Sequence, residues 1–164
     1  MVGIGFGIDG TDPRYSALKD RFLDLYERHL CVDTRLFEGM AELLDTLETR
    51  GLLWGIVTNK AARFTQPLVQ RLGLIERAAC VVSGDTTSRA KPHPDPLLHA
   101  AAAIQLAPIR CLYVGDDLRD IQAARAAGMR SIAVRFGYLG TAEPPEAWGA
   151  DAVVTDPHEI LDHL

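Results

Sequence analysis

Short apolar runs alternate along the chain with stretches in which apolar residues recur every three or four positions. The runs are typical of buried strands, and the repeats are typical of amphipathic helices. We expect strands at residues 52–57, 80–82, 111–114, 131–134 and 152–154, and helices at residues 15–29, 40–50, 61–72, 96–106, 121–127 and 157–164. This alternation predicts an α/β fold built as a doubly wound parallel sheet.

The first twelve residues, MVGIGFGIDGTD, carry no clear pattern, because Gly3, Gly5 and Gly7 weaken a helix and a strand alike. An amphipathic helix is expected next, at residues 15–29. We place any domain boundary near residues 31–38, between this helix and the strand-rich remainder.

The composition adds few constraints. The 164 residues fit a single domain with a sizeable core, and 48% apolar and 24% charged residues are ordinary for a soluble globular protein. The net charge of −5 and the lack of a basic run argue against a nucleic-acid partner. No membrane-spanning stretch and no signal peptide appear. Cys31, Cys80 and Cys111 are scattered in apolar surroundings, which favours reduced thiols and a cytoplasmic location.

An acidic cluster follows the expected strand at residues 111–114. Asp116, Asp117 and Asp120 lie where that strand passes into a helix, and ligands of open α/β sheets bind at this carboxyl edge. One carboxylate is explained as a helix N-cap, but Asp116 and Asp120 would share a helix face and repel. Carboxylates and water suit Mg²⁺, so we expect the three acids to form a magnesium site. The competing interpretation is one cap beside a solvated acidic face.

Two further polar groups lie near expected strand ends. Thr58 follows the strand at residues 52–57 and offers a hydroxyl and a backbone N–H, with Asn59 next to it. Lys91 lies in SRAKPHPDP, a loop that three prolines stiffen. A hydroxyl and an ammonium facing a metal site form a phosphate clamp. Alternatively, Thr58 only caps the next helix and Lys91 is an ordinary surface lysine.

With these residues the chain resembles the haloacid dehalogenase-like (HAD) superfamily of phosphatases, from about residue 36 to the C-terminus. Thr58 in IVTN is similar to the second motif of that family, and Lys91 in AKPHPDP is similar to the third. Asp116, Asp117 and Asp120 in VGDDLRD are similar to the fourth. The segments LLWGIVTNK and WGADAVV look most like the phosphoglycolate phosphatase branch, which includes N-acetylmuramic acid 6-phosphate phosphatases.

The resemblance implies a phosphatase that hydrolyses a small phosphate monoester through an aspartyl-phosphate. It implies Mg²⁺ as the cofactor, with Asp116 as a direct ligand and Asp117 and Asp120 supporting the metal site. Thr58 and Lys91 are the implied catalytic residues, and Thr58, Asn59 and Lys91 are the implied phosphate-binding residues. The partner is then a small phosphorylated metabolite.

The chain departs from the family at the first motif. That motif is a strand ending in DxDGT, and its first Asp is the nucleophile. The nearest string here is FGIDGT, in which Gly7 occupies the nucleophile position beside Asp9. Either the motif has decayed, or the likeness is accidental and the true motif is missing.

We favour the second explanation, because only about fifty positions separate Asp9 from Thr58. Residues 1–33 are then the end of a helical cap, and residues 34–164 are a HAD-like core lacking its first strand. The nucleophile would lie upstream, and the chain as printed would be inactive. The expected alternative is a relative without a nucleophile that binds phosphate or Mg²⁺. The N-terminal residues are expected to be helical or irregular and outside the sheet, because three glycines offer little surface to anchor a central strand.

Overall fold

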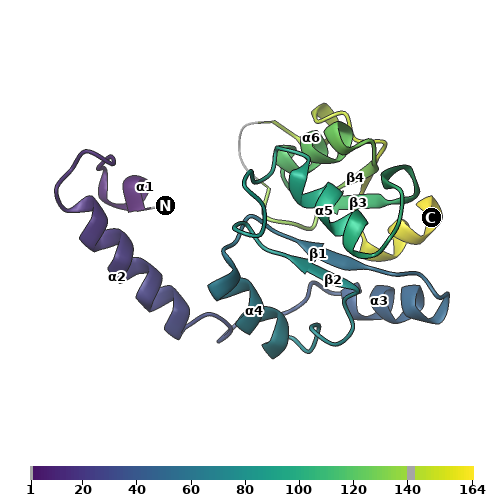
Figure 1. Ribbon diagram of the computed structural model, residues 1–164, viewed down its shortest axis with the longest axis horizontal. Helices are drawn as coiled ribbons and strands as arrows, with labels where there is room; N and C mark the ends of the chain where they lie inside the picture. Colours follow the sequence, from purple (N-terminus) through teal and green to yellow (C-terminus); the bar gives the residue numbers. More distant parts are fainter. Residues whose placement is uncertain (1, 140–142) are drawn as a thin grey trace. The chain divides into compact units, whose positions relative to one another are not determined.

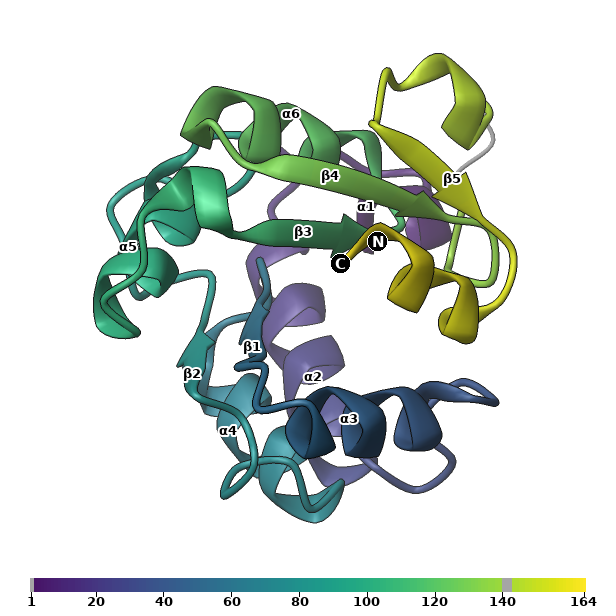
Figure 2. The same ribbon diagram turned by 90° about the vertical axis from the view of Figure 1, so that its right-hand side faces the viewer.

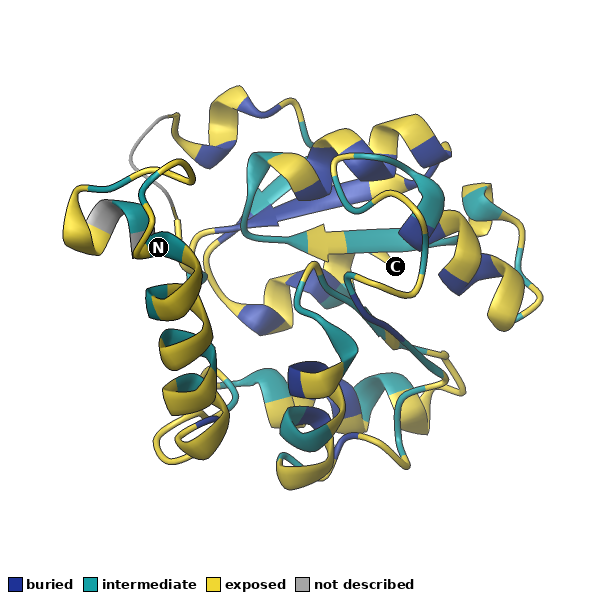
Figure 3. Ribbon diagram, turned by 60° about the vertical axis from the view of Figure 1, so that its left-hand side comes forward, coloured by how far each residue is buried: buried dark blue, intermediate teal, exposed yellow. Residues whose placement is uncertain are grey.

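The structure, a computed structural model, describes residues 2–139 and 143–164. It divides into two compact units, Met1–Arg35 and Leu36–Leu164, which we describe separately (Figure 1). The first unit holds helices α1 (Val2–Phe6) and α2 (Tyr15–Arg28), which pack against each other. No residue of α2 is buried, and Figure 3 accordingly shows this helix in the colours of exposed and intermediate residues.

The N-terminal residues are helical, as expected. Helix α1 ends at Phe6, and Gly7 continues in a left-handed conformation with φ of +63°. Asp9 then accepts hydrogen bonds from the backbone N–H and the hydroxyl of Thr11, at 2.8 and 2.5 Å. FGIDGT therefore lies at a helix end and a turn, which contradicts its interpretation as a decayed strand motif.

The second unit alternates strands and helices. Its strands are β1 (Gly55–Val57), β2 (Cys80–Val82), β3 (Leu112–Gly115), β4 (Arg130–Val134) and β5 (Ala152–Val154). Its α-helices are α3 (Met40–Thr49), α4 (Ala62–Arg71), α5 (Asp95–Ala103) and α6 (Leu118–Ala127), and its 3₁₀ helices are η1 (Pro108–Arg110), η2 (Pro145–Ala147) and η3 (Pro157–His163). Every strand pair is parallel, which confirms the expected fold class.

The strands form two sheets rather than one. The order is β1-β2 in the first sheet and β3-β4-β5 in the second (Figure 2). The division falls between β1 and β3, each of which pairs along one edge only within the described residues. Val114 of β3 is 37% exposed.

Helices cover both faces of the larger sheet. Successive residues of a strand point to opposite faces, so the side chains of Ile132 and Ala133 in β4 lie on opposite faces of the sheet. Ile132 packs with Leu43 of α3 and Ile160 of η3. Ala133 packs with Ile121 of α6 on the other face. This two-sided cover is the doubly wound arrangement that the sequence predicted.

Several element bounds differ from the expectation. Strand β1 begins at Gly55 instead of residue 52, because Gly51, at φ of +70°, ends α3 and the Leu52 N–H donates back to Leu47. The C-terminal helix is a 3₁₀ helix. Within the described part of the chain, no helix is both long and apolar enough to cross a membrane. Cys31, Cys80 and Cys111 are free thiols and are half-buried.

Candidate phosphate and metal site

The carboxyl ends of the strands in the second unit carry a polar hollow of about 300 Å³. It is lined by Thr58, Asn59, Lys60, Lys91, Asp116, Asp117, Arg119, Asp120 and Tyr138. All six residues that the sequence suggested for the site are in this set. Their common location agrees with the rule that ligands of open α/β sheets bind at this edge.

Lys91 holds the centre of the site. Its side chain is 9% exposed, and its ammonium forms a 2.8 Å ion pair with Asp120, which is 10% exposed. The same ammonium donates to the Val57 carbonyl at 2.8 Å and to the Tyr113 hydroxyl at 2.7 Å. An ammonium has three N–H donors, so all three are occupied in this arrangement. The alternative that Lys91 is an ordinary surface lysine is therefore wrong.

Asn59 fixes the backbone of Lys91. Its side-chain N–H donates to the Lys91 carbonyl at 2.8 Å, and its side-chain oxygen accepts from the Lys91 N–H at 3.0 Å. These paired bonds join the end of β1 to the proline-stiffened loop. The side-chain amide of Asn59 therefore positions the backbone of Lys91.

Thr58 presents its hydroxyl but not its backbone N–H. The N–H donates to the Val82 carbonyl and continues the pairing of β1 with β2, so the expectation that it is available to a ligand is wrong. The hydroxyl oxygen accepts from the Lys60 N–H at 3.1 Å. A hydroxyl that accepts one hydrogen bond still has its own hydrogen to donate, so Thr58 can donate it to a ligand.

Asp116 is held by the loop that follows β4. One carboxylate oxygen accepts from the Tyr138 N–H at 2.7 Å. The preceding residue is Gly137, where an added Cβ would lie 2.1 Å from the Cβ of Asp116. Real Cβ atoms essentially never approach so closely, so this loop can approach the carboxylate only with glycine at that position.

Asp117 and Asp120 have protein partners already. Asp117 caps α6 by accepting from the Arg119 N–H at 2.8 Å, and it pairs with the Arg119 guanidinium at 2.6 Å. The hydrogen bond from the Arg119 side chain is the main reason that the pKa of Asp117 is lowered. Asp120 faces Lys91 and packs against Gly115, where a Cβ would lie 2.3 Å from its own.

The charges of the site are balanced, with three carboxylates against Lys60, Lys91 and Arg119. Within residues 2–139 and 143–164, no group of three His, Cys, Asp or Glu side chains is placed to hold a metal together. Asp116 differs from Asp117 and Asp120 because its described contact comes from a backbone N–H, that of Tyr138, and not from a basic side chain. This arrangement fits Mg²⁺, which takes one or two carboxylates and completes its shell with water and substrate phosphate.

The sequence interpretation missed Tyr113 and Tyr138. Burial, followed by the nearby charges of Asp120 and Asp116, raises the pKa of Tyr113 well above its usual value, so its hydroxyl stays protonated. That hydroxyl donates to the Val57 carbonyl at 3.0 Å. Tyr138 was assigned only to a loop, although it follows the strand at residues 131–134 and so ends at the same edge as Asp116. That placement was the available signal for Tyr138.

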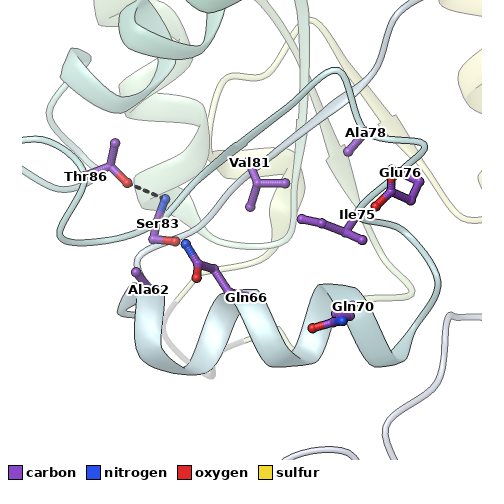
Figure 4. A pocket seen from close by; sticks show the side chains of 9 residues that line it. All are labelled: Ala62, Gln66, Gln70, Ile75, Glu76, Ala78, Val81, Ser83 and Thr86. Atoms are coloured by element: carbon purple, nitrogen blue, oxygen red, sulfur yellow. Dashed lines mark hydrogen bonds between the residues drawn. The ribbon is translucent and has the colours of Figure 1, made fainter.

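A second hollow, of about 510 Å³, lies between α4 and β2 (Figure 4). Gln66, Gln70, Ser83 and Thr86 contribute to its polar lining, and Glu76 is the one charged residue among the described residues that line it. A hollow without a cation is poorly suited to a phosphate. It is larger than the first hollow, but its chemistry does not match the motifs.

Comparison with known proteins assigns the family. The model of the haloacid dehalogenase-like hydrolases matches residues 8–134. The chain belongs to this family. The matched range spans strands β1 to β4 and includes Thr58, Lys91 and Asp116.

The HAD chain is similar to curated phosphatases. It is 44% identical over 164 residues to the N-acetylmuramic acid 6-phosphate phosphatase of Pseudomonas aeruginosa, which covers all of this chain and 73% of that protein. It is 46% identical over 146 residues to the phosphoglycolate phosphatase of Xanthomonas campestris, covering 89% of this chain and 66% of that protein. These relatives confirm the resemblance inferred from the motifs.

Solved structures agree with the fold. One is described as a predicted phosphoglycolate phosphatase from Haemophilus somnus, with a TM-score of 0.88 at 27% identity, covering 98% of this chain and 71% of the other. Another is a hydrolase from Pseudomonas syringae, with a TM-score of 0.79 at 30% identity, covering 99% and 73%.

Proposed function

We propose that this chain forms the phosphate-binding and Mg²⁺-binding part of a HAD phosphomonoesterase that acts on a small phosphorylated metabolite. One observation carries the proposal. Thr58, Lys91 and Asp116 come from three separate segments and line a single hollow at the carboxyl edge of parallel strands. The named relatives that share this chain's sequence are phosphatases.

Each residue has a distinct role in this proposal. Thr58 donates its hydroxyl hydrogen to a phosphate oxygen. Lys91 exchanges one of its three acceptors for another phosphate oxygen, while Asn59 keeps its backbone in place. Asp116 holds Mg²⁺, which supplies positive charge to the phosphoryl oxygens when bound. Asp117 and Asp120 orient the site through Arg119 and Lys91.

The nucleophile is proposed to come from a strand that is not among the printed residues. Support comes from the two sheets, whose strands β1 and β3 each keep an edge without a paired strand in the described residues. A strand between them would end beside Thr58 and Asp116. Its carboxylate would attack phosphorus as the bond to the alcohol breaks, and water would then hydrolyse the aspartyl-phosphate.

The names of the relatives supply two candidate substrates, phosphoglycolate and N-acetylmuramic acid 6-phosphate. The three free thiols support a reducing compartment such as the cytoplasm. The net charge of −5 supports a partner other than nucleic acid.

A second candidate function is a relative that binds phosphate or Mg²⁺ without turnover, and the lack of an Asp at position 7 favours it.

Activity measurements separate these two functions. The chain as printed should show no Mg²⁺-dependent turnover of p-nitrophenyl phosphate above background, because loss of a nucleophile costs several orders of magnitude in rate. Fusion behind the first strand and cap of the Pseudomonas aeruginosa relative should produce turnover that Lys91→Ala abolishes. A fusion that folds, binds phosphate and remains inactive would favour the non-catalytic relative. Turnover by the printed chain that Asp9→Asn abolishes would show that FGIDGT works as a catalytic motif after all.

A further inference from the structure

An exposed aromatic side chain stands at the rim of the phosphate site. Tyr138 lines the hollow beside Lys91 and Asp116, yet it is 87% exposed. Burial of aromatic rings is strongly favourable, so a ring left in water beside a polar site is a candidate ligand contact. Nothing in the phosphate chemistry described above uses this ring.

The position of Tyr138 is fixed from two sides. Its backbone N–H donates to Asp116 at 2.7 Å, and Gly137 allows the loop to reach that carboxylate. Its ring lies 5.7 Å from the ring of Phe37, which in turn makes an edge contact with Phe136 at 5.7 Å. We call Phe37, Phe136 and Tyr138 the aromatic rim. The ring is therefore held beside the phosphate site before any ligand binds.

The rest of the lining includes polar and charged side chains. Asn59, Lys60 and Arg119 border the same hollow. A ligand that satisfies both sides needs an apolar face for the ring and hydroxyl groups for the polar lining. A pyranose has this character, because its C–H groups cluster on its faces and its hydroxyls lie around its edge. A two-carbon phosphate ester has no comparable apolar face to stack on an aromatic ring.

We propose that Tyr138 is a specificity-determining residue that stacks on the sugar ring of a pyranose phosphate. The inference rests on the proposed phosphate site and deepens it by naming the substrate class. It assigns the non-phosphate part of the ligand to the aromatic rim. It also makes Tyr138 the residue that distinguishes a sugar phosphate from a short phosphorylated acid.

Binding measurements test this role without requiring turnover. Calorimetry in buffer containing MgCl₂ would compare N-acetylglucosamine 6-phosphate, 2-phosphoglycolate and inorganic phosphate. The sugar phosphate should bind about three- to tenfold more tightly than the other two, the size expected of one aromatic contact. Tyr138→Ala should remove this preference and Tyr138→Phe should keep it. Ile109→Ala is a matched control, because it removes an apolar side chain that is 73% exposed away from the hollow lining.

A second readout reports stacking directly. The C–H protons of the bound sugar should shift upfield in NMR spectra of the wild-type protein and of Tyr138→Phe, but not of Tyr138→Ala. Lys91→Ala tests the phosphate site separately from the role of Tyr138, because it should weaken the binding of all three ligands. Equal affinities for the three ligands, with Lys91 still required, would overturn the role of Tyr138 alone. Absence of all phosphate binding would overturn the phosphate site and this inference together.

Discussion

The hydroxyl of Tyr113 on β3 donates a 3.0 Å hydrogen bond to the carbonyl of Val57 at the end of β1. Thr58 donates its N–H to β2, so the neighbouring Val57 carbonyl points to the opposite edge of β1. That edge has no paired strand within the described residues. In a continuous sheet, the Val57 carbonyl would accept a hydrogen bond from a neighbouring strand. Here the Tyr113 hydroxyl and the Lys91 ammonium donate to it instead. This pairing matters because an unpaired backbone group away from water is costly.

Removing this hydroxyl should destabilise the fold. Tyr113→Phe leaves the Val57 carbonyl and the Lys91 ammonium each one partner short, which should lower the free energy of unfolding by about 1–2 kcal/mol in urea titrations. Tyr138→Phe is a suitable control, because it removes the same group from a ring that is 87% exposed. Equal effects of the two substitutions would show that the bond between the sheets contributes nothing.

Breaking the ion pair of Lys91 with Asp120 should lower the free energy of unfolding more than Tyr113→Phe does. Lys91→Met leaves the carboxylate of Asp120 buried without its cation, and such a change typically costs about 3–5 kcal/mol of unfolding free energy. The double variant with Asp120→Asn should recover part of this loss, because the uncompensated charge is gone. Lys19→Met, on the exposed surface of α2, should change stability by less than about 0.5 kcal/mol. Strictly additive single effects in the cycle would contradict the pair.

The close approach at Gly137 should not tolerate a side chain. Gly137→Ala places a Cβ 2.1 Å from the Cβ of Asp116, so the loop or the carboxylate has to move. We expect a loss of about 1–3 kcal/mol in chemical denaturation, as overpacking usually gives. Gly10→Ala should be tolerated, since an added Cβ there meets no atom within 4 Å. An unchanged midpoint for Gly137→Ala would disprove the contact.

The N-cap of α6 should make stability depend on pH. The pKa of Asp117 is lowered in the fold, chiefly by the side chain of Arg119. Its stabilisation is therefore present above the unfolded pKa of about 3.9 and is lost as the pH falls through the lower folded value. Asp117→Ala should cost about 1 kcal/mol at pH 7, the usual value of a cap.

Thermal melts of the wild type and of Asp117→Ala at pH 7, 5 and 3 would measure this dependence. The difference between the two proteins should be similar at pH 7 and pH 5 and should shrink at pH 3. Asp117→Asn keeps a neutral cap and should fall between them. A difference that grows on acidification would have the wrong sign for a lowered pKa.

Magnesium binding should depend on Asp116. With Asp116 as the main carboxylate ligand, we expect an affinity of about millimolar, given how reluctantly Mg²⁺ loses water. Titration calorimetry should show that Asp116→Ala removes this binding. Asp162→Asn, an exposed acid on η3, should not. Micromolar affinity, or affinity that survives Asp116→Ala, would refute the assignment.

The sequence by itself determined the alternation of strands and helices and six of the residues that line the site. Hydrophobic periodicity places residues 52–57 and 111–114 as strands, and the residue after a parallel strand must lie at the carboxyl edge. Thr58 and Asp116 follow from that rule alone. One of the acids was recognisable as a cap, because N-capping depends on residues only two or three positions away, and the structure shows that it is Asp117.

Tertiary structure alone decided how those members are used. Asn59 bonds to Lys91 across 32 positions, and Tyr113 bonds to Val57 across 56, distances over which local patterns carry no information. The divided sheet has the same origin, since an apolar run specifies a strand but not which strands lie beside it. The contact of Gly137 with Asp116 likewise arises only when β3 and β4 pair, because their loops then meet at one edge.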